Sequence, residues 1–499
     1  MRFVSFFVDG KTRIAPESLA PHNHLFTASS FYNLPDFDQP LINEDFSYNP
    51  TLQAELSGKL LLLDELSLSL DEIQEHYNHG FIRYSKGIET KQGYDKCSRC
   101  GNSENRLFAS FSCYRCKEPQ CTYCRNCIMM GRISQCTPLV SWCGPELEWR
   151  DSNSELVWEG ILSPEQLKAS DTLVEKIGMK DKLLIWAVCG SGKTEVLFQG
   201  IEKALKDGQR VCIATPRTDV VLELLPRFRR IFPGITLSCL YGGSMDKLEG
   251  AQLILSTTHQ LFRYREAFDL IIVDEVDAFP FSYDKTLAFA VQQAKKEEAL
   301  IVYLSATPDR NMKQQAEDGK LPFVKIPKRY HGFPLPVPRF VWCGHWKKGL
   351  KRNKLPRYVM NWISRQMERN RQSFLFVPSV RMLDQIVPIL KEVNAKIEGV
   401  HAEDPDRKVK VMRFRHGATP ILVTTTILER GVTIPFTDVA VLGAEEEIFS
   451  ESALVQISGR AGRSKDDPAG EVLFFHYGKT KAMVQAKRHI EQMNREAGL

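Results

Sequence analysis

Short apolar runs separated by amphipathic stretches fill the chain from about residue 160 onward. The first set reads LLIWAV (183–188), RVCIATP (210–216), QLILSTT (252–258), FDLIIVDE (268–275) and LIVYLSAT (300–307). Uninterrupted apolar runs of this length are typical of parallel strands that are buried on both faces. The intervening stretches are long enough for crossover helices. The pattern therefore predicts a doubly wound α/β domain over residues 155–330.

A proline-rich segment, IPKRYHGFPLPVPRF (326–340), ends this first set, and such segments are typical of linkers. A second set of apolar runs follows: SFLFVPS (373–379), KIEGVHA (396–402), ILVTTT (421–426), VAVLGA (439–444) and EVLFFHY (471–477). We expect a second α/β domain over residues 340–499, in tandem with the first.

Residues 1–90 do not show this alternation. Pro, Asn and Asp residues punctuate the region, and the stretch LLLDELSLSLDEIQEHY (61–77) places its leucines and one isoleucine at roughly helical spacing. We predict one helix there, within an N-terminal accessory region to which the sequence assigns no role.

The composition is that of a soluble globular protein, with 43% hydrophobic and 25% charged residues. No apolar stretch approaches the ~18 residues of a membrane-spanning helix, and MRFVSFFVDG at the start lacks the pattern of a signal peptide. We therefore expect a cytoplasmic protein. The net charge of +5 divides into −7 for residues 1–90 and +12 for the remainder. A basic body of this kind indicates an anionic partner such as nucleic acid.

Eight of the thirteen cysteines lie between Cys97 and Cys136, mostly in Cys-x-x-Cys pairs. In a cytoplasmic chain such pairs indicate zinc, because a two-residue gap lets both sulfurs reach one ion. We expect a zinc-binding module over residues 91–145. Its ligand set is open: Cys97 and Cys100 can be completed by Cys113 and Cys116 or by Cys124 and Cys127, and Cys113, Cys116, Cys121 and Cys136 can form a second set.

The same module is basic and carries aromatic residues. Its arginines are Arg99, Arg106, Arg115, Arg125 and Arg132, and they alternate with Phe108, Phe111, Tyr114 and Tyr123. Arginines that meet phosphates and rings that stack on bases suit the binding of single strands.

The stretch AVCGSGKTE (187–195) has the order strand, glycine turn, helix that is typical of a phosphate-binding loop. Its glycines let backbone N–H groups approach phosphate oxygens closely. Lys193 is placed to reach the β- and γ-phosphates and Thr194 to hold Mg²⁺. Ala187 stands where the pattern has its first glycine, which is tolerable if its φ stays negative. The predicted ATP-binding residues of this loop are Ala187, Val188, Cys189, Gly190, Ser191, Gly192, Lys193, Thr194 and Glu195.

The apolar run at residue 268 ends in an acidic box, Asp-Glu-Val-Asp (274–277). A carboxylate at the end of a strand can orient the Mg²⁺ ion, and we assign this role to Asp274. We assign Glu275 the role of general base that polarises the attacking water.

In their order along the chain, these motifs resemble those of superfamily 2 helicases and translocases. The other matching stretches are LSPEQ (162–166), ATPRTDV (214–220), STTHQL (256–261), SAT (305–307), TTTILERGVTIP (424–435) and QISGRAGRS (456–464). The resemblance implies two tandem RecA-like domains that hydrolyse ATP. It also implies that Gln166 reads adenine and that SAT couples hydrolysis to domain movement.

A nucleotide held between two domains needs a cation from the second domain. Arg460 and Arg463 suit this role, because guanidinium matches phosphate oxygens and stabilises transition-state charge. Gln456 is placed to orient the γ-phosphate or the water. Groups at predicted strand ends are expected to contact a nucleic-acid backbone without reading bases. These are Arg217, Thr257, Thr258, Thr425 and Thr426.

Several stretches resemble the ComFA family of competence ATPases from Gram-positive bacteria over roughly residues 90–499. They are CSRCGN, YCRNCIMMGR, DEVDAFP, TTILERGV and the C-terminal QMNREAGL. The resemblance implies Cys97, Cys100, Cys124 and Cys127 as the primary zinc ligands. It implies a single-stranded DNA translocase that draws transforming DNA into the cell. The implied partners are the competence membrane DNA channel and other competence proteins, at the inner face of the membrane. The oligomeric state is left open.

Other functions share these features. A replication-restart helicase of the PriA kind also combines cysteines with such a motor, but there the cysteines interrupt the motor, whereas here they precede it. An RNA helicase is a second rival. The alternative from another class is a zinc-containing nucleic-acid-binding scaffold with weak ATPase activity. The presence of Lys193, Glu275 and Arg460 argues against that scaffold.

Overall fold

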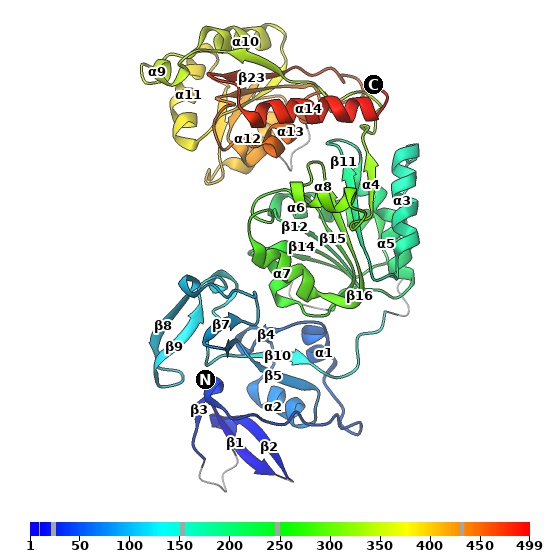
Figure 1. The fold of residues 1–499 in the computed structure, drawn as a ribbon, viewed down its shortest axis with the longest axis vertical. Coiled ribbons are helices and arrows are strands. Elements are labelled where there is room, and N and C mark those ends of the chain that lie inside the picture. Colours follow the sequence, from blue (N-terminus) through cyan, green and yellow to red (C-terminus); the bar gives the residue numbers. More distant parts are fainter. Residues whose placement is uncertain (9, 21–25, 150–154, 245–249, 430–433) are drawn as a thin grey trace. The chain divides into compact units, whose positions relative to one another are not determined.

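The computed structural model describes residues 1–8, 10–20, 26–149, 155–244, 250–429 and 434–499 (Figure 1). Contacts along the chain define two compact units. The first comprises Met1–Glu159, Leu173–Leu183 and Phe198–Tyr303, and the second comprises Gly160–Thr172, Leu184–Leu197 and Leu304–Leu499. Every helix in the described part of the chain is too short or too polar to span a lipid bilayer.

Two small antiparallel sheets begin the first unit, with the strand orders β2-β1-β3 and β4-β10-β5. The strands are β1 (Arg2–Val8), β2 (Lys11–Pro16), β3 (Ser29–Ser30), β4 (Leu61–Leu62), β5 (Ile82–Lys86) and β10 (Pro138–Trp142), and the helices are α1 (Pro50–Leu56) and α2 (Leu70–Asn78). Phe3 packs edge to face on Phe31 and Tyr84, with ring centroids 5.0 and 5.6 Å away. This part of the chain therefore has its own core.

The helix predicted in the leucine-rich stretch is only half correct. The stretch first forms β4 and a 3-10 turn, Leu63–Glu65, and α2 begins only at Leu70. Ser69 sets that start, because its Oγ accepts from Glu72 N while the Glu72 carboxylate accepts from Ser69 N, at 3.3 and 3.1 Å. This reciprocal capping box satisfies two backbone donors at the first turn.

The cysteine-rich segment is inserted between two paired strands. Pro138 of β10 faces Lys86 of β5, so the chain leaves and re-enters the sheet at one place. The segment contains two β-hairpins, β6 (Ile88–Lys91) with β7 (Tyr94–Cys97) and β8 (Phe108–Cys113) with β9 (Glu118–Cys124). The border expected at residue 90 therefore falls inside one folded body, since the sheet joins residues from both sides of it.

A seven-stranded sheet has the order β13-β14-β12-β15-β16-β11-β17. Its strands are β11 (Lys182–Ala187), β12 (Val211–Thr215), β13 (Leu237–Leu240), β14 (Leu253–Thr257), β15 (Phe268–Val273), β16 (Lys295–Ser305) and β17 (Phe323–Ile326). Helix α3 (Pro164–Lys176) precedes the strands, and the helices between them are α4 (Lys193–Val196), α5 (Phe198–Lys206), α6 (Thr218–Ile231), α7 (Lys285–Ala294) and α8 (Arg310–Glu317). Every residue of β12 and β14 is buried, as their continuous apolar runs predict.

The second unit also contains a six-stranded parallel sheet with the order β18-β23-β22-β19-β21-β20. Its strands are β18 (Arg339–Trp342), β19 (Gln372–Phe376), β20 (Glu398–Val400), β21 (Ile421–Thr424), β22 (Thr437–Leu442) and β23 (Val472–His476). The helices are α9 (Trp346–Leu350), α10 (Arg357–Glu368), α11 (Val380–Val393), α12 (Arg407–Arg415), α13 (Glu451–Ser458) and α14 (Lys481–Glu496).

Both faces of this sheet are covered, because successive side chains of a strand point to opposite sides. Phe374 and Phe376 of β19 enter a core formed with α13 and α14, whereas Leu375 between them enters a core formed with α10 and α11. Figure 1 shows these two helix pairs around the sheet that contains β23. The expected fold class, two doubly wound α/β domains preceded by a cysteine-rich module, is confirmed.

Candidate ATP site and cysteine centres

The phosphate-loop sequence forms a tight turn between a buried strand and a short helix. Strand β11 ends at buried Ala187, and α4 begins at Lys193. Gly190 and Gly192 have φ values of 79° and 71°, left-handed conformations that glycine adopts without steric penalty. Ala187 is not among the described non-glycine residues with positive φ. The alanine therefore fits the end of the strand, as expected.

Gln166 lies against this loop. Its Nε2 donates to the Ser191 carbonyl over 2.7 Å, and its Oε1 accepts from Ser163 N over 2.8 Å. A Cβ at Gly192 would stand 2.4 Å from Gln166 Nε2. The left-handed φ therefore favours glycine at that position, and a side chain there would also displace the end of the Gln166 side chain. The adenine contact expected of Gln166 stays a prediction.

The acidic box follows β15 directly. Asp274 N donates to the Ala214 carbonyl, and Asp274 Oδ1 accepts from Glu275 N, both over 2.8 Å. Glu275 has a φ of 56°, which is uncommon for a residue with a side chain. Backbone strain of this kind clusters at functional sites, so it supports the catalytic role predicted for Glu275.

The SAT stretch contacts the helix that carries Gln456. Ser305 Oγ accepts from Thr307 N over 3.0 Å, and Thr307 Oγ1 lies 2.7 Å from Ser452 Oγ on α13. These hydroxyls thus link the end of β16 to α13 within the second compact unit. The contact agrees with the coupling role that the resemblance implies for this motif.

The end of α13 abuts the phosphate loop. Cys189 Sγ donates to Gln456 Oε1 over 2.9 Å, and both residues are buried. A Cβ at Gly459 would stand 2.4 Å from Cys189 Cβ. The segment Gly459–Arg463, called the arginine loop below, therefore begins in direct contact with the phosphate loop.

The two arginines of the arginine loop are anchored on backbone carbonyls. Arg460 is 1% exposed, and its Nε donates to the Glu429 carbonyl over 3.1 Å. Arg463 Nε donates to the Gly459 carbonyl over 2.9 Å. The predicted site residues Gln166, Lys193, Thr194, Gln456, Arg460 and Arg463 belong to the second compact unit, whereas Asp274 and Glu275 belong to the first.

The groups expected to contact a nucleic-acid backbone are only partly accessible. Thr258 is fully buried and Thr257 is 6% exposed, so the expected phosphate contact of Thr258 is wrong for this conformation. Arg217 forms an ion pair with Asp219 at 2.8 Å. Thr425 and Thr426 are half-buried, and residues 430–433 of the same motif lie outside the described residues.

The eight clustered cysteines form two buried sets of four. One contains Cys97, Cys100, Cys124 and Cys127, and the other Cys113, Cys116, Cys121 and Cys136, with all Sγ atoms of a set within 4.8 Å of one another. Individual Sγ–Sγ distances are 3.6 Å for Cys97–Cys127, 3.7 Å for Cys100–Cys124 and 3.8 Å for Cys113–Cys136. Tetrahedral zinc with Zn–S bonds of ~2.3 Å has S–S edges of ~3.8 Å, so both sets fit zinc. The alternative ribbon that joins Cys97 and Cys100 to Cys113 and Cys116 is wrong.

The β8–β9 hairpin explains this partition. Cys121 and Cys124 lie three residues apart on β9, and side chains at odd separations on a strand point to opposite faces. Hydrogen bonds from neighbouring thiols favour one thiolate in each set. The bond from Cys100 is the largest cause that lowers the pKa of Cys124, and the bond from Cys121 lowers the pKa of Cys136 to about 4.

The first cysteine set is docked on α7 of the first α/β domain. Gln293 Nε2 donates to the Arg99 carbonyl over 3.4 Å, and Asn126 Nδ2 donates to Thr286 Oγ1 over 3.2 Å. Gly101, with a φ of 70°, lies so close that a Cβ would stand 2.7 Å from the Phe289 ring. Both Cys-x-x-Cys turns therefore touch the same helix.

Arg99 does not face solvent, which corrects its expected role in strand binding. Its side chain is fully buried and pairs with Glu65, whose other oxygen accepts from Arg263 Nε over 2.7 Å. Arg263 ends the 3-10 segment Thr258–Arg263 that follows β14. The Arg99–Glu65–Arg263 ion triad thus joins the N-terminal region, the first cysteine set and the first α/β domain.

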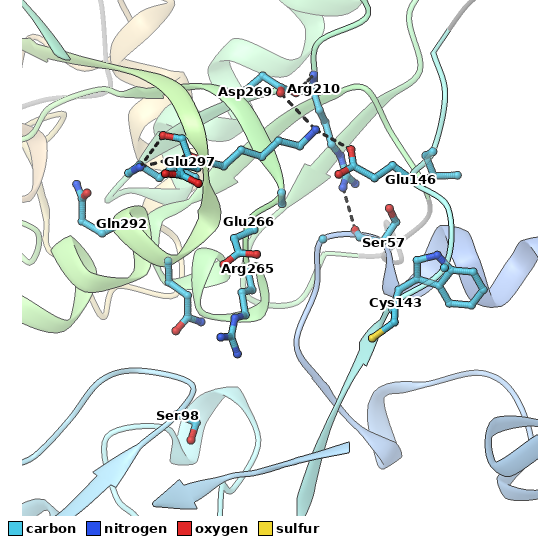
Figure 2. A pocket seen from close by; sticks show the side chains of 18 of the residues that line it. Ser57, Ser98, Cys143, Glu146, Arg210, Arg265, Glu266, Asp269, Gln292 and Glu297 are labelled. Carbon is cyan, nitrogen blue, oxygen red and sulfur yellow. Dashed lines mark hydrogen bonds and ion pairs between the residues drawn. The ribbon is translucent and has the colours of Figure 1, made fainter. Parts of the chain in front are cut away.

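A cavity of about 1020 Å³ lies in the first unit at the amino ends of β12, β15 and β16. Lys296 Nζ lies 2.8 Å from Glu146 and 3.3 Å from Asp269 on its polar wall. Arg210 donates to the Ser57 carbonyl over 3.0 Å, and Figure 2 labels this pair beside Glu146 and Asp269. Ligands of open α/β sheets bind at the carboxyl ends of the strands. The position of this cavity therefore separates it from the predicted nucleotide site.

The chain is similar to known proteins over most of its length. A competence protein ComFA of Bacillus subtilis is 51% identical over 454 residues, which cover 91% of this chain and 97% of that protein. The ComFA of Streptococcus pneumoniae is 38% identical over 76% of this chain and 87% of its own length. The chain belongs to the ComFA family. The model of the ComFA N-terminal domain matches residues 43–141, which include both cysteine sets.

The ComFA-family chain also carries both halves of a helicase. The type III restriction enzyme res subunit model matches residues 159–310, and the helicase conserved C-terminal domain matches residues 351–465. Mycobacterium smegmatis helicase Lhr shares the fold, with a TM-score of 0.50 and 18% identity over 68% of this chain and 48% of that one. The protein is therefore an ATP-hydrolysing superfamily 2 helicase or translocase related to competence.

Among the charged residues of this ComFA-family chain that were not singled out in the sequence are half-buried Glu65 and buried Arg329. Glu65 lies in a region without a recognisable motif, and no local signal marks it. Arg329 lies in the proline-rich segment interpreted as a linker, yet it is 2% exposed. Its position a few residues after the apolar run of β17 is a weak signal.

Proposed function

We propose that the chain is an ATP-driven single-stranded DNA translocase that serves the uptake of transforming DNA. The observation that supports this most directly is the buried hydrogen bond from Cys189 to Gln456. It brings the arginine loop to the phosphate loop, as required when hydrolysis uses cations from the second domain. Cycles of closing and opening around ATP would then move a strand that is held by its backbone.

Each site residue has a role in this proposal. Backbone N–H groups of the loop Ala187–Glu195 and the Lys193 ammonium bind the phosphates. Glu275 takes a proton from the attacking water, and Gln456 orients that water or the γ-phosphate. Arg460 and Arg463 stabilise the negative charge of the transition state, because a guanidinium matches phosphate oxygens.

Thr194 and Asp274 would hold Mg²⁺. A hydroxyl and a carboxylate are hard oxygen donors of the kind that Mg²⁺ takes from proteins while it keeps several waters. The ion would neutralise charge on the phosphates when ATP is bound. Asp274 is held in place for this role by its bond from Glu275 N.

Zinc would occupy both cysteine sets, the first through Cys97, Cys100, Cys124 and Cys127. Four thiolates close a tetrahedral site, which makes it structural rather than catalytic. Asn102 Nδ2 donates to Cys124 Sγ over 3.7 Å, and Ser134 Oγ lies 3.6 Å from Cys136 Sγ. Such polar neighbours orient the ligands of a metal site.

The charge distribution supports a single-stranded DNA partner. Residues 91–499 carry a net charge of +12. On the cysteine-rich segment the Arg132 guanidinium lies 4.5 Å from the centroid of the Phe111 ring, and Tyr114 is 81% exposed. Cations beside exposed rings suit a flexible strand whose bases are free to stack.

Family membership supports a place for the protein at the competence DNA channel. We propose that it works in the cytoplasm, peripherally at the inner face of the membrane, with other competence proteins. The exposed acidic charge of residues 1–90 makes that region better suited to protein partners than to DNA.

The first experiment measures ATP hydrolysis by the purified full chain with no nucleic acid, with single-stranded DNA, with duplex DNA and with RNA. We expect strong stimulation by single-stranded DNA and weak stimulation by the others. Lys193→Ala serves as the control, and it should bind DNA but not hydrolyse ATP.

Other outcomes select between the alternatives. Preference for forked duplex would favour a PriA-like restart helicase, and preference for RNA would favour an RNA helicase. Hydrolysis that ignores nucleic acid, or that is absent, would contradict the translocase and leave a zinc-containing scaffold as the better account.

A further inference from the structure

The proline-rich segment after β17 carries a buried arginine to which the proposed function assigns no role. Arg329 is 2% exposed, although the segment reads as a linker in the sequence. Burying a guanidinium is unfavourable unless its donors find partners. The contacts of Arg329 therefore indicate what the position is for.

On one side, the guanidinium holds the backbone of the arginine loop. Arg329 Nη1 donates to the Gly462 carbonyl over 2.5 Å, and Nη2 donates to the carbonyls of Ala461 and Gly459 over 2.8 and 3.4 Å. Hydrogen bonds from a charged donor are about twice as strong as neutral ones. The planar fork thus fixes three carbonyls in the stretch that carries Arg460 and Arg463.

On its other side, the same segment contacts the phosphate loop. Tyr330 N donates to the Gly190 carbonyl over 3.0 Å, and Val188 N donates to the Ile326 carbonyl over 3.1 Å. A Cβ at Gly190 would stand 3.9 Å from Arg329 Cγ and 4.0 Å from its Nε. Arg329 therefore lies against both the phosphate loop and the arginine loop.

The charge of Arg329 has no carboxylate partner among the described residues. Burial, together with the nearby Arg463 guanidinium, lowers the pKa of Arg329 to about 10. Arg329 Nε has no acceptor within the described part of the chain. Two neighbouring cations beside a phosphate loop form an environment that is stabilised when an anion arrives.

We propose that Arg329 is a positioning residue for ATP hydrolysis, which holds the arginine loop against the phosphate loop so that Arg460 and Arg463 meet the phosphates. This inference rests on the proposed use of those arginines. With this role for Arg329, the proline-rich segment takes part in ATP hydrolysis as well as connecting the two α/β domains. Arg329 acts through the loop backbone, so its loss should slow turnover more than it weakens ATP binding.

The test compares R329A, R329K and the wild type in DNA-stimulated ATP hydrolysis. Arg352, which is exposed, provides the control variant R352A. For R329A we expect kcat to fall by roughly 100-fold, the effect of misplacing catalytic groups by about 1 Å, while KM for ATP changes by no more than about threefold. R329K keeps the charge but not the planar fork, so its kcat should lie between the two.

Chemical rescue separates positioning from folding. Guanidinium ion at low millimolar concentration should restore part of the kcat of R329A by entering the space that the side chain leaves, and it should not change R352A. Urea at the same concentration provides the uncharged control. If R329A does not fold, R329Q takes its place and is compared with R329K in the same assay.

The outcomes are distinct. Wild-type turnover in R329A would overturn the role of Arg329 and leave the proposed function intact. A loss of kcat in folded R329A that guanidinium does not restore, or a loss confined to KM, would also overturn it. An inactive wild-type chain would overturn the proposed function together with this inference.

Discussion

The Cys189 thiol donates a hydrogen bond to the side-chain oxygen of Gln456, a residue 267 positions later in the chain, over 2.9 Å. Both residues are buried. The contact means that the phosphate loop and the helix leading into the arginine loop are packed without space between them. Close packing of this kind transmits small changes in volume.

We predict that a single methyl group at Gly459 disturbs this contact. Gly459 has a φ of −64°, so alanine fits the backbone, but its Cβ would stand 2.4 Å from Cys189 Cβ. Gly459→Ala should lower kcat for ATP hydrolysis by roughly tenfold or more, because the arginine loop must shift. Cys189→Gly removes the opposing atom together with the thiol that bonds Gln456, so the double variant should be no less active than Cys189→Gly alone. Equal activity of Gly459→Ala and wild type would show that the contact does not matter for turnover.

A substitution in the acidic box can distinguish ATP binding from hydrolysis. Glu275→Gln keeps the size of the side chain and removes the proposed base, so we predict a loss in kcat of roughly 100-fold or more with little change in ATP affinity. Single-turnover hydrolysis and binding of a fluorescent ATP analogue measure the two quantities. A variant that retains turnover would assign the base to another residue, and Asp277→Asn is the matched control within the same box.

Metal content tests the two cysteine sets. We predict two zinc ions per chain by elemental analysis. Cys100→Ser with Cys124→Ser should remove one ion, and Cys113→Ser with Cys136→Ser should remove the other, because each pair belongs to one set. Loss of a structural zinc also removes stability, so each double variant should unfold at a lower temperature. The wild-type chain could instead contain one zinc ion that remains bound in the Cys113→Ser/Cys136→Ser variant. That result would show that Cys113, Cys116, Cys121 and Cys136 hold no zinc.

Much of the fold follows from the sequence because its strands are buried on both faces. Such strands are continuous apolar runs, and their order with the glycine loop and the acidic box predicts two parallel sheets. The helix expected from the leucine-rich stretch was half wrong for a related reason. The leucines of this stretch enter one core from a strand, a turn and a helix, and in the sequence they recur at a spacing close to that of one helix. Only the capping box of Ser69 and Glu72 marks where the helix begins.

The candidate site was predictable where local spacing carries the chemistry. The residues of the phosphate loop and the first cysteine set have such spacing. The partition of the cysteines depended on which face of β9 each one occupies, and the sequence alone left it open. Glu65 and Arg329 act through long-range contacts, with Arg263 and with the arginine loop. No local pattern encodes such contacts, so only the structure reveals them.

The ion triad predicts a pH dependence of stability. Burial alone would raise the pKa of Glu65, but Arg99 and Arg263 outweigh burial and hold that pKa below its usual value. The folded carboxylate thus releases its proton more readily than the unfolded one. The stability it contributes is complete above the ordinary glutamate pKa and is lost as the pH falls through the lower folded value.

Glu65→Gln should therefore destabilise the chain at pH 7 by about 3 kcal/mol, because it leaves the fully buried Arg99 without its counter-ion. The difference in free energy of unfolding between the variant and the wild type should narrow only as the pH falls below the ordinary glutamate pKa toward the lower folded value. Thermal unfolding across this range measures it. Asp64→Asn, which removes an exposed partner of Arg115, should change stability by less than about 1 kcal/mol at every pH. A difference between Glu65→Gln and wild type that does not vary with pH would contradict the triad.

The pairing of Pro138 with Lys86 has a consequence for how this protein could have been assembled. The residues between them, 87–137, leave the sheet after Lys86 and re-enter it at the directly paired Pro138. The residues of a short hairpin turn connect two paired strands in the same way. A single insertion event at such a turn would have added the whole cysteine-rich segment without breaking the sheet around it. The reverse change, a deletion to a tight turn, would keep the pairing of the two strands but would remove Arg99 and leave Glu65 with Arg263 alone. The strands therefore tolerate the segment at this place, whereas its side chains have since made it part of the fold.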